Sequence, residues 1–520
     1  MVIYPEGVWY SIKTVADVDE IIETHLVGGG RVERLMLMPD QPFPDEADDA
    51  GDPGRAAATA ALLTRCRHAG GPAVREMTGD TIFALSSGGG RAAIAVVRVS
   101  GPAARMALAG IGGEPLPEPR QATLRRFRQP ETGEPFDCGL ALWLPAPGSA
   151  TGEDMAEFHV HGGPAVLSAL LEALGALPGL RPAEPGEFTR RAFEAGRLDL
   201  TEAEGIADLV AAETEAQRRQ ALAQMEGGLH RLYEGWRDRL MALRAHVEAA
   251  IDFSDQDLGE DPMAAAAPDL AALEAEIAAH LDDSRRGERL REGFAIAIVG
   301  APNAGKSSLL NRLAGRDAAI VSTRAGTTRD VVEVRLDLAG WPITLADTAG
   351  LRESSDEIES EGVRRALDRA ASADLSLVVF DGALWPEADA ASLAMLGDDA
   401  LAVLNKTDLL SSPVPDRIDR HAALGVSCLT GAGIEALLET LVAEIARRYP
   451  AGGAPVLTRI RHRQAVVESR DALTRALAGP ADERLAEELR LAAHALGRIT
   501  GRVDVEAVLD LVFRDFCIGK

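Results

Sequence analysis

Apolar side chains recur along this chain with more than one spacing, and each spacing predicts a different kind of structure. Between residues 200 and 292 they return every third or fourth position, which predicts amphipathic helices with a break at Gly227-Gly228. Pro262 and Pro268 predict a loop, followed by a further helix over 270–290. The helical spacing returns at 458–515.

Short apolar runs alternate with helical segments between residues 294 and 447. The runs at 294–299, 375–379 and 400–404 have the length of buried strands, and each precedes a predicted helix. This alternation is typical of a parallel, doubly wound sheet. Because the α/β region lies between two helical regions, we expect it to be inserted into a single helical domain.

The first 196 residues follow neither pattern consistently. Strand-like runs at 92–99 and 139–144, separated by many Gly and Pro residues, predict a mixed α+β domain. Residues 1–76 differ from the rest, and their loose stretch rich in Pro, Asp and Gly predicts an atypical, partly disordered extension. We therefore expect a multidomain α/β and α+β protein with the segments 1–76, 77–196, 197–293, 294–447 and 448–520.

Composition narrows the class of protein only slightly. The net charge of −27 argues against broad, charge-driven binding to nucleic acid, although it permits a local basic groove. The four cysteines form no CxxC pair, so we expect free thiols at Cys66, Cys138, Cys428 and Cys517. With no apolar run of about 18 residues and no signal peptide, we expect a cytoplasmic protein that does not enter a membrane.

The segment 300–307, Gly-Ala-Pro-Asn-Ala-Gly-Lys-Ser, carries the strongest chemical signal. It follows a predicted strand and opens a predicted helix, which is the context of a phosphate-binding P-loop. Its glycines let backbone N–H groups surround phosphates, Lys306 places a positive charge on the outer phosphates, and Ser307 can ligate Mg²⁺. We therefore predict a nucleotide-binding domain.

Further segments, in the order that a GTP-binding domain requires, identify the base. Asp347-Thr348-Ala349-Gly350 ends a predicted strand and can hold Mg²⁺ through water and reach the terminal phosphate. Asn405-Lys406-Thr407-Asp408 ends another, and the Asp408 carboxylate can accept the two N–H donors of guanine, a pattern that adenine lacks. Lys406 can lie along the base, and Ser427-Cys428 can offer backbone N–H groups to the guanine carbonyl.

A loop between these segments, Ser322–Thr327, can become ordered on the nucleotide, and the adjacent Thr328 is the expected second Mg²⁺ ligand. The residues that we predict to bind GTP are Asn303, Ala304, Gly305, Lys306, Ser307, Ser308, Ser322, Thr323, Arg324, Ala325, Gly326, Thr327, Thr328, Asp347, Thr348, Ala349, Gly350, Asn405, Lys406, Thr407, Asp408, Ser427 and Cys428.

Hydrolysis needs a group that orients the attacking water. Ras-like switches use a glutamine directly after the Asp-x-x-Gly motif, but this chain has Leu351 there. A substitute is therefore required, and four acids follow closely: Asp356, Glu357, Glu359 and Glu361. The sequence alone does not show which of these four acids orients the water.

These motifs resemble those of the MnmE (TrmE) tRNA-modification GTPases over residues 78–520. The resemblance rests on Asn303 within the P-loop, on Gly326-Thr327-Thr328-Arg329-Asp330, on the inserted position of the domain, and on the terminal Phe516-Cys517-Ile518-Gly519-Lys520. It implies that Asn303, with Ser322, Arg324 and Thr327, ligates a K⁺ ion that offsets charge developing between the phosphates. It also selects Glu359 as the catalytic residue that orients water.

The same resemblance implies a second binding site and several partners. Residues 77–196 would bind 5-formyltetrahydrofolate or a related tetrahydrofolate through Arg98, Glu157, Arg197 and Lys520, and would hold a homodimer together. The family usually has Lys where Arg197 stands. The implied partner is an MnmG/GidA-like FAD protein in a heterotetramer. Together they would add a carboxymethylaminomethyl-type group at carbon 5 of the tRNA wobble uridine.

Other interpretations of the sequence remain. A ribosome-assembly GTPase is the alternative function, although such proteins usually append a basic RNA-binding domain. His159 and His161 alternate on one predicted strand and could bind a metal, but no third ligand is evident. Residues 1–38 resemble the tail of a thioredoxin-like [2Fe-2S] ferredoxin without its cluster cysteines, so we expect no cluster. We expect either a fusion remnant or a wrongly placed start, with Met77 as the native initiator.

Overall fold

The chain forms two units, residues 1–73 and 74–520, which are described separately. In this computed structural model the described residues are 2–3, 8–9, 79–252, 262–283, 285–315, 319–320, 333–347, 373–449, 456–479, 483–503, 509, 512–513, 516 and 519. In the first unit, β1 (Val2–Ile3) pairs antiparallel with β2 (Val8–Trp9). The loose stretch rich in Pro, Asp and Gly, which the sequence predicts to be part of a partly disordered extension, lies outside the described residues.

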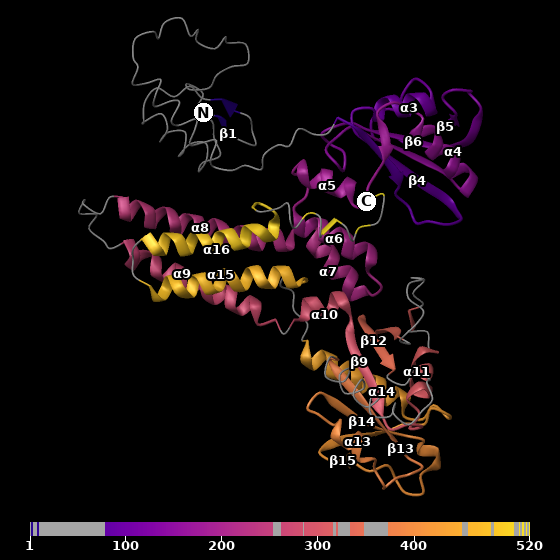
Figure 1. The fold of residues 1–520 in the computed structure, drawn as a ribbon, viewed down its shortest axis with the longest axis vertical. Helices are drawn as coiled ribbons and strands as arrows, with labels where there is room; N and C mark the ends of the chain where they lie inside the picture. Colours follow the sequence, from indigo (N-terminus) through magenta and orange to yellow (C-terminus); the bar gives the residue numbers. More distant parts are fainter. Residues whose placement is uncertain are drawn as a thin grey trace, which may run out of the picture. The chain divides into compact units, whose positions relative to one another are not determined.

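A six-stranded sheet opens the second unit, in the order β5-β6-β7-β4-β3-β8 (Figure 1). Its strands are β3 (Thr81–Leu85), β4 (Ala92–Ser100), β5 (Thr123–Arg128), β6 (Pro135–Leu144), β7 (Met155–Gly162) and β8 (Leu180–Pro182). Helices α3 (Ala104–Gly112) and α4 (Pro164–Gly175) pack on the face that presents Val97, Phe127 and Phe158. Because side chains alternate along a strand, Arg98 and Glu157 lie on the other face, as does α5 (Glu187–Glu194) with Phe188.

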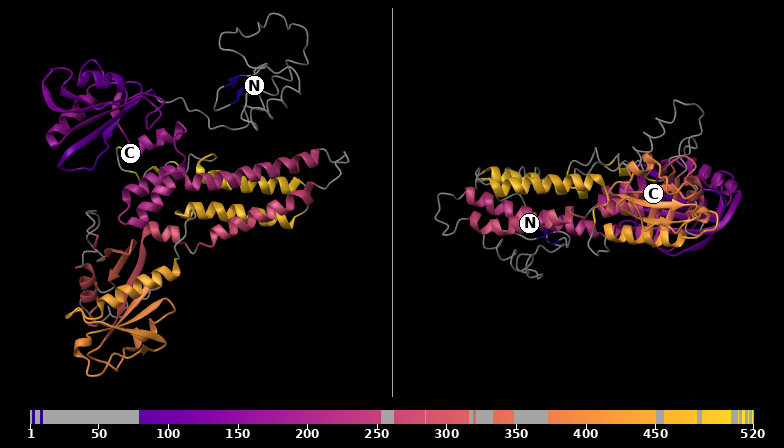
Figure 2. Two further views of the ribbon diagram at one scale, coloured as in Figure 1. Left: turned by 180° about the vertical axis from the view of Figure 1, so that it is seen from behind. Right: turned by 90° about the horizontal axis from the view of Figure 1, so that it is seen from below.

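Helices from both sides of the α/β region form one bundle. They are α6 (Leu200–Ala211), α7 (Glu215–Met225), α8 (Gly228–Asp252), α9 (Pro262–Leu281), α10 (Arg286–Glu292), α15 (Ile460–Ala478) and α16 (Glu483–Thr500). Helices α8, α9, α15 and α16 lie side by side in both figures, and they share one apolar core (Figures 1 and 2). Tyr233, Leu240 and Val247 recur every seven residues along α8 and are all buried.

The helix predicted over 270–290, after a loop at the prolines, is wrong in both boundaries. Helix α9 begins at Pro262, where a missing N–H costs nothing because the first helical N–H groups have no intrahelical acceptor, and it contains Pro268. It ends at Leu281, and Arg285 takes a left-handed backbone (φ 59°) before α10. The predicted break at Gly227 is confirmed, since α7 ends at Met225 and Gly227 has φ 79°.

The α/β region builds an eight-stranded sheet in the order β10-β11-β12-β9-β13-β14-β16-β15. The strands are β9 (Phe294–Gly300), β10 (Ala319–Ile320), β11 (Glu333–Leu338), β12 (Trp341–Asp347), β13 (Leu375–Asp381), β14 (Ala400–Asn405), β15 (Arg417–Ile418) and β16 (His421–Gly425). Five neighbouring strands, β12, β9, β13, β14 and β16, run parallel, as the alternating pattern predicts. Helices α11 (Lys306–Ala314) and α14 (Ile434–Arg448) cover one face, and the segment containing α13 (Ala390–Ala394) covers the other.

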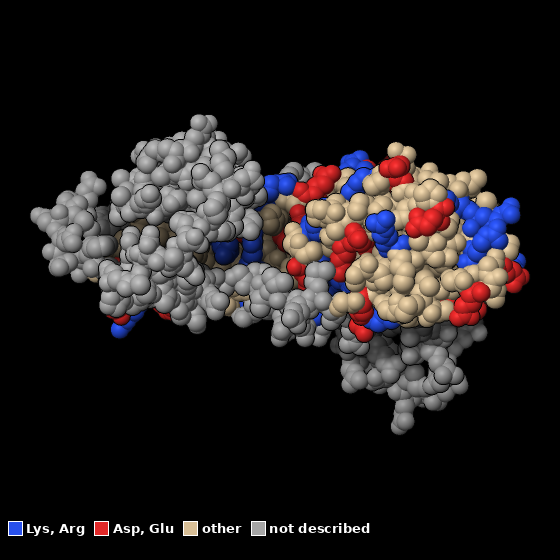
Figure 3. Space-filling view, turned by 90° about the horizontal axis from the view of Figure 1, so that it is seen from above, with Lys and Arg blue, Asp and Glu red and all other residues tan. Residues whose placement is uncertain are grey.

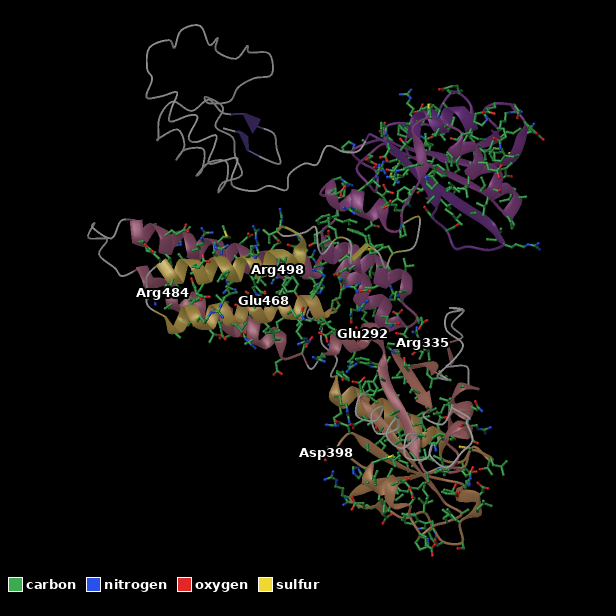
Figure 4. The ribbon with its side chains drawn as sticks, in the orientation of Figure 1. Glu292, Arg335, Asp398, Glu468, Arg484 and Arg498 are labelled. Carbon is green, nitrogen blue, oxygen red and sulfur yellow. The ribbon has the colours of Figure 1, made fainter. Side chains whose placement is uncertain are left out.

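Short helix α10 forms a joint between the bundle and this sheet. Its Arg289 pairs with Asp374, just before β13, at 2.8 Å, and its Arg291 pairs with Asp208 of α6 at 3.0 Å. Across the same joint, Arg335 of β11 pairs with Glu213, which follows α6, at 3.1 Å. Figure 4 shows Arg335 at the end of the sheet that faces α10, near Glu292. Ion pairs therefore contribute to the joint.

Glu204 of α6 is the buried carboxylate of the neighbouring ionic network. Its carboxylate binds Arg461 and Arg459 at 2.8 and 3.0 Å, and His462 at 2.9 Å. Burial raises the pKa of Glu204, but the positive charges of Arg461 and Arg459 outweigh burial and hold that pKa well below its usual range. The network thus fixes α6 to the beginning of α15.

The surface carries charges of both signs. On the face shown in Figure 3, Lys and Arg side chains are interspersed with Asp and Glu. Among the described residues, no helix is long and apolar enough to cross a membrane.

Candidate nucleotide-binding site

The loop between β9 and α11 has the backbone conformation that a phosphate cradle requires. Gly300 (φ 138°) lies against β13, and a Cβ on it would come within 2.3 Å of the Val379 carbonyl oxygen. Gly305 (φ 96°) precedes α11, and a Cβ on it would meet the Asn405 amide nitrogen at 2.2 Å. Asn303 between them is also left-handed, at φ 64°. Only glycine fits at 300 and 305, so the loop is free to close around a small anion.

Lys306, the first residue of α11, is buried beneath this loop. Its ammonium group donates to the carbonyl oxygens of Gly300 and Ala301, both at 2.8 Å. The N–H groups of the first turn of α11 point toward the same loop, because helix N-termini leave these donors without intrahelical acceptors. A cation and a helix N-terminus therefore converge where a nucleotide phosphate would bind.

Asn405 joins the phosphate loop to the loop after β16. Its amide nitrogen donates to the Ala304 carbonyl at 2.9 Å, and its amide oxygen accepts from the Cys428 backbone N–H at 3.3 Å. The side chain is almost fully buried, with 1% of its surface exposed. One residue thus holds two predicted parts of the GTP site at a fixed spacing.

Asp408 has the exposure that a base-recognising carboxylate needs. It lies in a short 3-10 turn after β14 and is exposed, while the buried Ser427 hydroxyl donates to one of its oxygens. The neighbouring Lys406 pairs with Asp381 at 2.6 Å, so its long side chain lies along the edge of the sheet.

Cys428 contributes through its backbone. Burial raises the pKa of its thiol, so the thiol is neutral at physiological pH. The backbone N–H of Cys428 donates to the Asn405 amide oxygen. This contact does not require a particular side chain at position 428.

Part of the predicted site lies outside the described residues. These positions are Ser322, Thr323, Arg324, Ala325, Gly326, Thr327, Thr328, Thr348, Ala349, Gly350, Glu359 and Lys520. The backbone of Asp347 is described, and it pairs with Ile298 at the carboxyl end of β12, beside the P-loop strand. Of the predicted metal ligands, Ser307 lies in the first turn of α11, where its hydroxyl suits Mg²⁺, and Asn303 lies in the loop.

A second polar cluster lies on the open face of the six-stranded sheet. Arg98 of β4 binds Glu157 of β7 at 3.1 Å through two guanidinium nitrogens, and its guanidinium carbon lies 5.8 Å from the centre of the Phe188 ring. The other oxygen of Glu157 faces His159 at 3.2 Å. Carboxylate, cation and aromatic ring together suit a planar heterocycle with hydrogen-bond donors.

Residues near the C-terminus reach the same sheet. The Ser86 hydroxyl, just after β3, donates to the Gly519 carbonyl at 2.9 Å. Gly519 has φ 97°, and a Cβ on it would lie 2.0 Å from the Leu85 carbonyl oxygen. Arg197, by contrast, is exposed after α5 and packs along Gly152. The structure thus brings the end of the chain to the sheet that carries Arg98 and Glu157.

Each histidine of the pair His159 and His161 has a carboxylate partner. His159 faces Glu157, and His161 lies 2.8 Å from Asp137. Among the described residues, no group of three or more His, Cys, Asp or Glu side chains could hold a metal ion. Sequence reasoning missed Asp381 as the partner of Lys406, although its place at the carboxyl end of β13 was a usable signal.

A P-loop, a buried lysine and the exposed Asp408 lie at the carboxyl edge of the parallel strands of one sheet, and this arrangement defines a GTP-hydrolysing P-loop protein. Comparison with protein families gives a finer identification: the model of the MnmE helical domain matches residues 200–517, and that of the GTP-binding protein TrmE N-terminus matches residues 81–197. The chain belongs to the MnmE/TrmE family.

Relatives with similar sequences match this chain over most of its length. It is 58% identical over 441 residues to the tRNA modification GTPase MnmE of Paramagnetospirillum magneticum, covering 85% of this chain and 100% of that relative. It is 59% identical over 445 residues to the protein of the same name from Parvibaculum lavamentivorans, with the same coverage. It is 50% identical over 475 residues to the mitochondrial 5-taurinomethyluridine-[tRNA] synthase subunit GTPB3 of Danio rerio, covering 85% of this chain and 93% of that relative.

Proposed function

We propose that this chain is a K⁺-activated GTP hydrolase that takes part in modifying carbon 5 of the tRNA wobble uridine. The observation that carries the proposal is a guanine-nucleotide site in a chain 58% identical to a tRNA modification GTPase over that relative's full length. The name of the GTPB3 relative, a taurinomethyluridine synthase subunit, supports uridine as the modified base. An MnmG/GidA-like FAD protein, bound in a heterotetramer, would supply the flavin chemistry.

The residues of the nucleotide site have distinct roles in this proposal. Asp408 accepts the guanine donors, Lys306 neutralises the outer phosphates, and Ser307 with Thr328 holds Mg²⁺. Asn303, Ser322, Arg324 and Thr327 hold K⁺, and Glu359 orients the attacking water. The two cations supply positive charge that offsets the charge developing on the phosphates during hydrolysis.

The six-stranded sheet is proposed to bind a tetrahydrofolate, such as 5-formyltetrahydrofolate. Glu157 would accept from the donor edge of the pterin, Arg98 would hold that carboxylate, and Arg197 and Lys520 would bind the ligand's anionic groups. The contact of Ser86 with Gly519, the residue before Lys520 in the sequence, supports this role of Lys520. The same region, residues 77–196, would hold the homodimer together.

The nucleotide-binding region is proposed to be a domain, 294–447, inserted between the halves 197–293 and 448–520 of one helical domain. The shared apolar core of α8, α9, α15 and α16 supports this arrangement. Nucleotide-dependent movement of the inserted domain would then pass to the bundle through the α10 joint. GTP hydrolysis would drive that movement, not the modification chemistry itself.

The proposal is tested by GTP turnover of the parent protein in K⁺ and in Na⁺, together with Glu359→Ala and the neighbouring control Glu361→Ala. We expect turnover to require K⁺, and Glu359→Ala to lower kcat by about 100-fold or more, as for loss of a group that activates water. Equal turnover in Na⁺ would contradict the K⁺ site. Normal turnover of Glu359→Ala, or equal loss in Glu361→Ala, would contradict the assignment of Glu359.

The tRNA part is tested separately by nucleoside analysis of tRNA from a deletion strain. We expect the wobble modification to disappear and to return when the parent gene is restored. An unchanged nucleoside profile would refute the role in tRNA modification and would leave the GTPase assignment standing.

A further inference from the structure

Ala301, the residue after Gly300 in the P-loop, connects two groups that are distant in sequence. Its carbonyl oxygen accepts from the Lys306 ammonium group at 2.8 Å. Its backbone N–H donates to the Ser392 hydroxyl oxygen, on α13, at 3.0 Å. The main chain of one residue therefore links the P-loop lysine to a helix on the opposite face of the sheet.

The orientation of the Ser392 hydroxyl is determined by Asp389. The hydroxyl donates its single proton to Asp389 Oδ2 at 2.8 Å, and the Ser392 backbone N–H donates to the same oxygen at 2.8 Å. Because that proton is committed to a carboxylate, the lone pairs of Ser392 are left to accept from Ala301. Ser392 is also buried, with 1% of its surface exposed, so water does not readily replace it.

This geometry also limits where the P-loop backbone can lie. A Cβ on Gly300 would collide with β13, so the loop leaves the sheet at a fixed point, and Ser392 fixes the next peptide group. The carbonyls of these two residues are the ones that bind the lysine. Movement of the Ala301 peptide would therefore move the Lys306 ammonium group relative to the phosphates.

We propose that Ser392 and Asp389 are positioning residues for GTP binding and hydrolysis, acting through Ala301 on Lys306. They do not need to touch the nucleotide. The competing explanation is a local structural role, because Asp389 also caps the N-terminus of α13. The two explanations differ in what loss of the Ser392 hydroxyl alone would change, since the cap uses the Ser392 backbone N–H.

The test compares Ser392→Ala with Ser392→Thr in the full-length protein. We measure affinity for fluorescent GDP and GTP analogues, kcat and KM for GTP, and the melting temperature. Loss of one hydrogen bond to a partly buried N–H should weaken nucleotide affinity about five- to tenfold, and threonine should restore it to within about twofold. The control is Thr440→Ala on α14, whose hydroxyl donates to the Ala436 carbonyl at 2.7 Å, away from the P-loop.

The outcomes separate the two explanations. Weakened affinity in Ser392→Ala that threonine restores, with parent affinity in Thr440→Ala, supports the positioning role. Unchanged affinity in a folded Ser392→Ala protein, or a lower melting temperature without a change in affinity, overturns it. If Ser392→Ala does not fold, Asp389→Asn distinguishes the two explanations, because asparagine keeps a side-chain oxygen for the helix cap. A loss of nucleotide affinity of about two- to threefold in Asp389→Asn supports the proposal, and parent affinity overturns it.

Discussion

The helical bundle and the α10 joint are held together by different kinds of interaction. In the bundle, buried apolar side chains of α8, α9, α15 and α16 form a single core. In the joint, two ion pairs connect the helices to the nucleotide-binding region, Arg289–Asp374 and Arg335–Glu213, and a third pair, Arg291–Asp208, holds α10 to α6. An apolar core resists any separation, whereas partly exposed ion pairs are individually weak and can exchange partners.

The difference indicates that the bundle is the rigid region and that the joint is the region that can move. Close-packed cores shift between discrete arrangements only at considerable cost, so the bundle is suited to stay fixed. A joint of ion pairs can be remade with little net change in free energy. We therefore expect mutations in the bundle and its buried ionic network to affect stability, and mutations in the joint to have much smaller effects.

The largest effect is expected for Glu204→Ala. This change removes the carboxylate that pairs with Arg461 and His462, while Arg459 keeps its pair with Asp208 at 2.9 Å; it should lower the free energy of unfolding by about 3–5 kcal/mol. Urea denaturation followed by circular dichroism measures it, with the exposed Glu439→Ala as control. A loss below about 1 kcal/mol would show that the network contributes no more than a surface ion pair.

The next largest effect is expected for Leu489→Ala on α16. Leu489 has 1% of its surface exposed within the bundle core, so truncation should cost about 2–5 kcal/mol through lost burial and a cavity. Leu491 lies two residues further on the same helix with 39% of its surface exposed, and Leu491→Ala should cost less than about 1 kcal/mol. Equal losses of unfolding free energy in the two variants would contradict the comparison, because the stability of the bundle would then not depend on its apolar core.

Mild acid should also weaken the bundle. Burial lowers the pKa of His280 to about 4, and burial together with the charge of Arg461 lowers the pKa of His462 to about 4. The unfolded chain, with an ordinary histidine pKa near 6.5, therefore binds more protons between pH 6.5 and 4. The free energy of unfolding should therefore decrease as the pH falls from 6.5 to 4, by about 1.4 kcal/mol per pH unit for each histidine.

Glu204 contributes its own pH dependence only below that window. Its folded pKa is depressed, so its contribution is complete above the unfolded value near 4.3 and is lost as pH falls further. Replacing His280 by Gln should reduce the slope between pH 6.5 and 4 by about half while leaving the loss below pH 4. A slope unchanged in His280→Gln would rule out His280 as a contributor.

The smallest effect is expected for Arg335→Ala in the joint. Its partner Glu213 and its own side chain are both partly exposed, so the pair should contribute less than about 1 kcal/mol and vanish in high salt. A double-mutant cycle with Glu213→Ala in unfolding experiments isolates that contribution. A coupling above about 2 kcal/mol would mean that the joint is as rigid as the bundle.

The parts of the fold that follow local rules are predictable from the sequence. The strands at β9, β13 and β14, the P-loop context and the break at Gly227 all depend on short runs of neighbouring residues. The same holds for the order of the GTP-binding motifs, because each motif follows its own strand. These features need no knowledge of distant contacts.

Features that depend on distant residues are not predictable in this way. The break between α9 and α10 occurs where Arg463, about 180 positions away, binds Asp283 at 2.6 Å and the Leu281 carbonyl at 3.0 Å. Helical spacing alone does not reveal that Leu281 ends a helix. The bond between Ala301 and Ser392 joins residues 91 positions apart, and Asp389 with Ser392 resembles an ordinary helix cap in sequence.

Asn405 has a consequence for engineering the nucleotide preference of this protein. Guanine recognition and phosphate binding are often treated as separate modules that can be exchanged between GTPases. Here the residue that opens the base-recognising tetrapeptide also donates to the Ala304 carbonyl in the P-loop. A graft that replaces residues 405–408 would therefore alter the phosphate loop too, whereas a change at Asp408 alone would leave that loop in place.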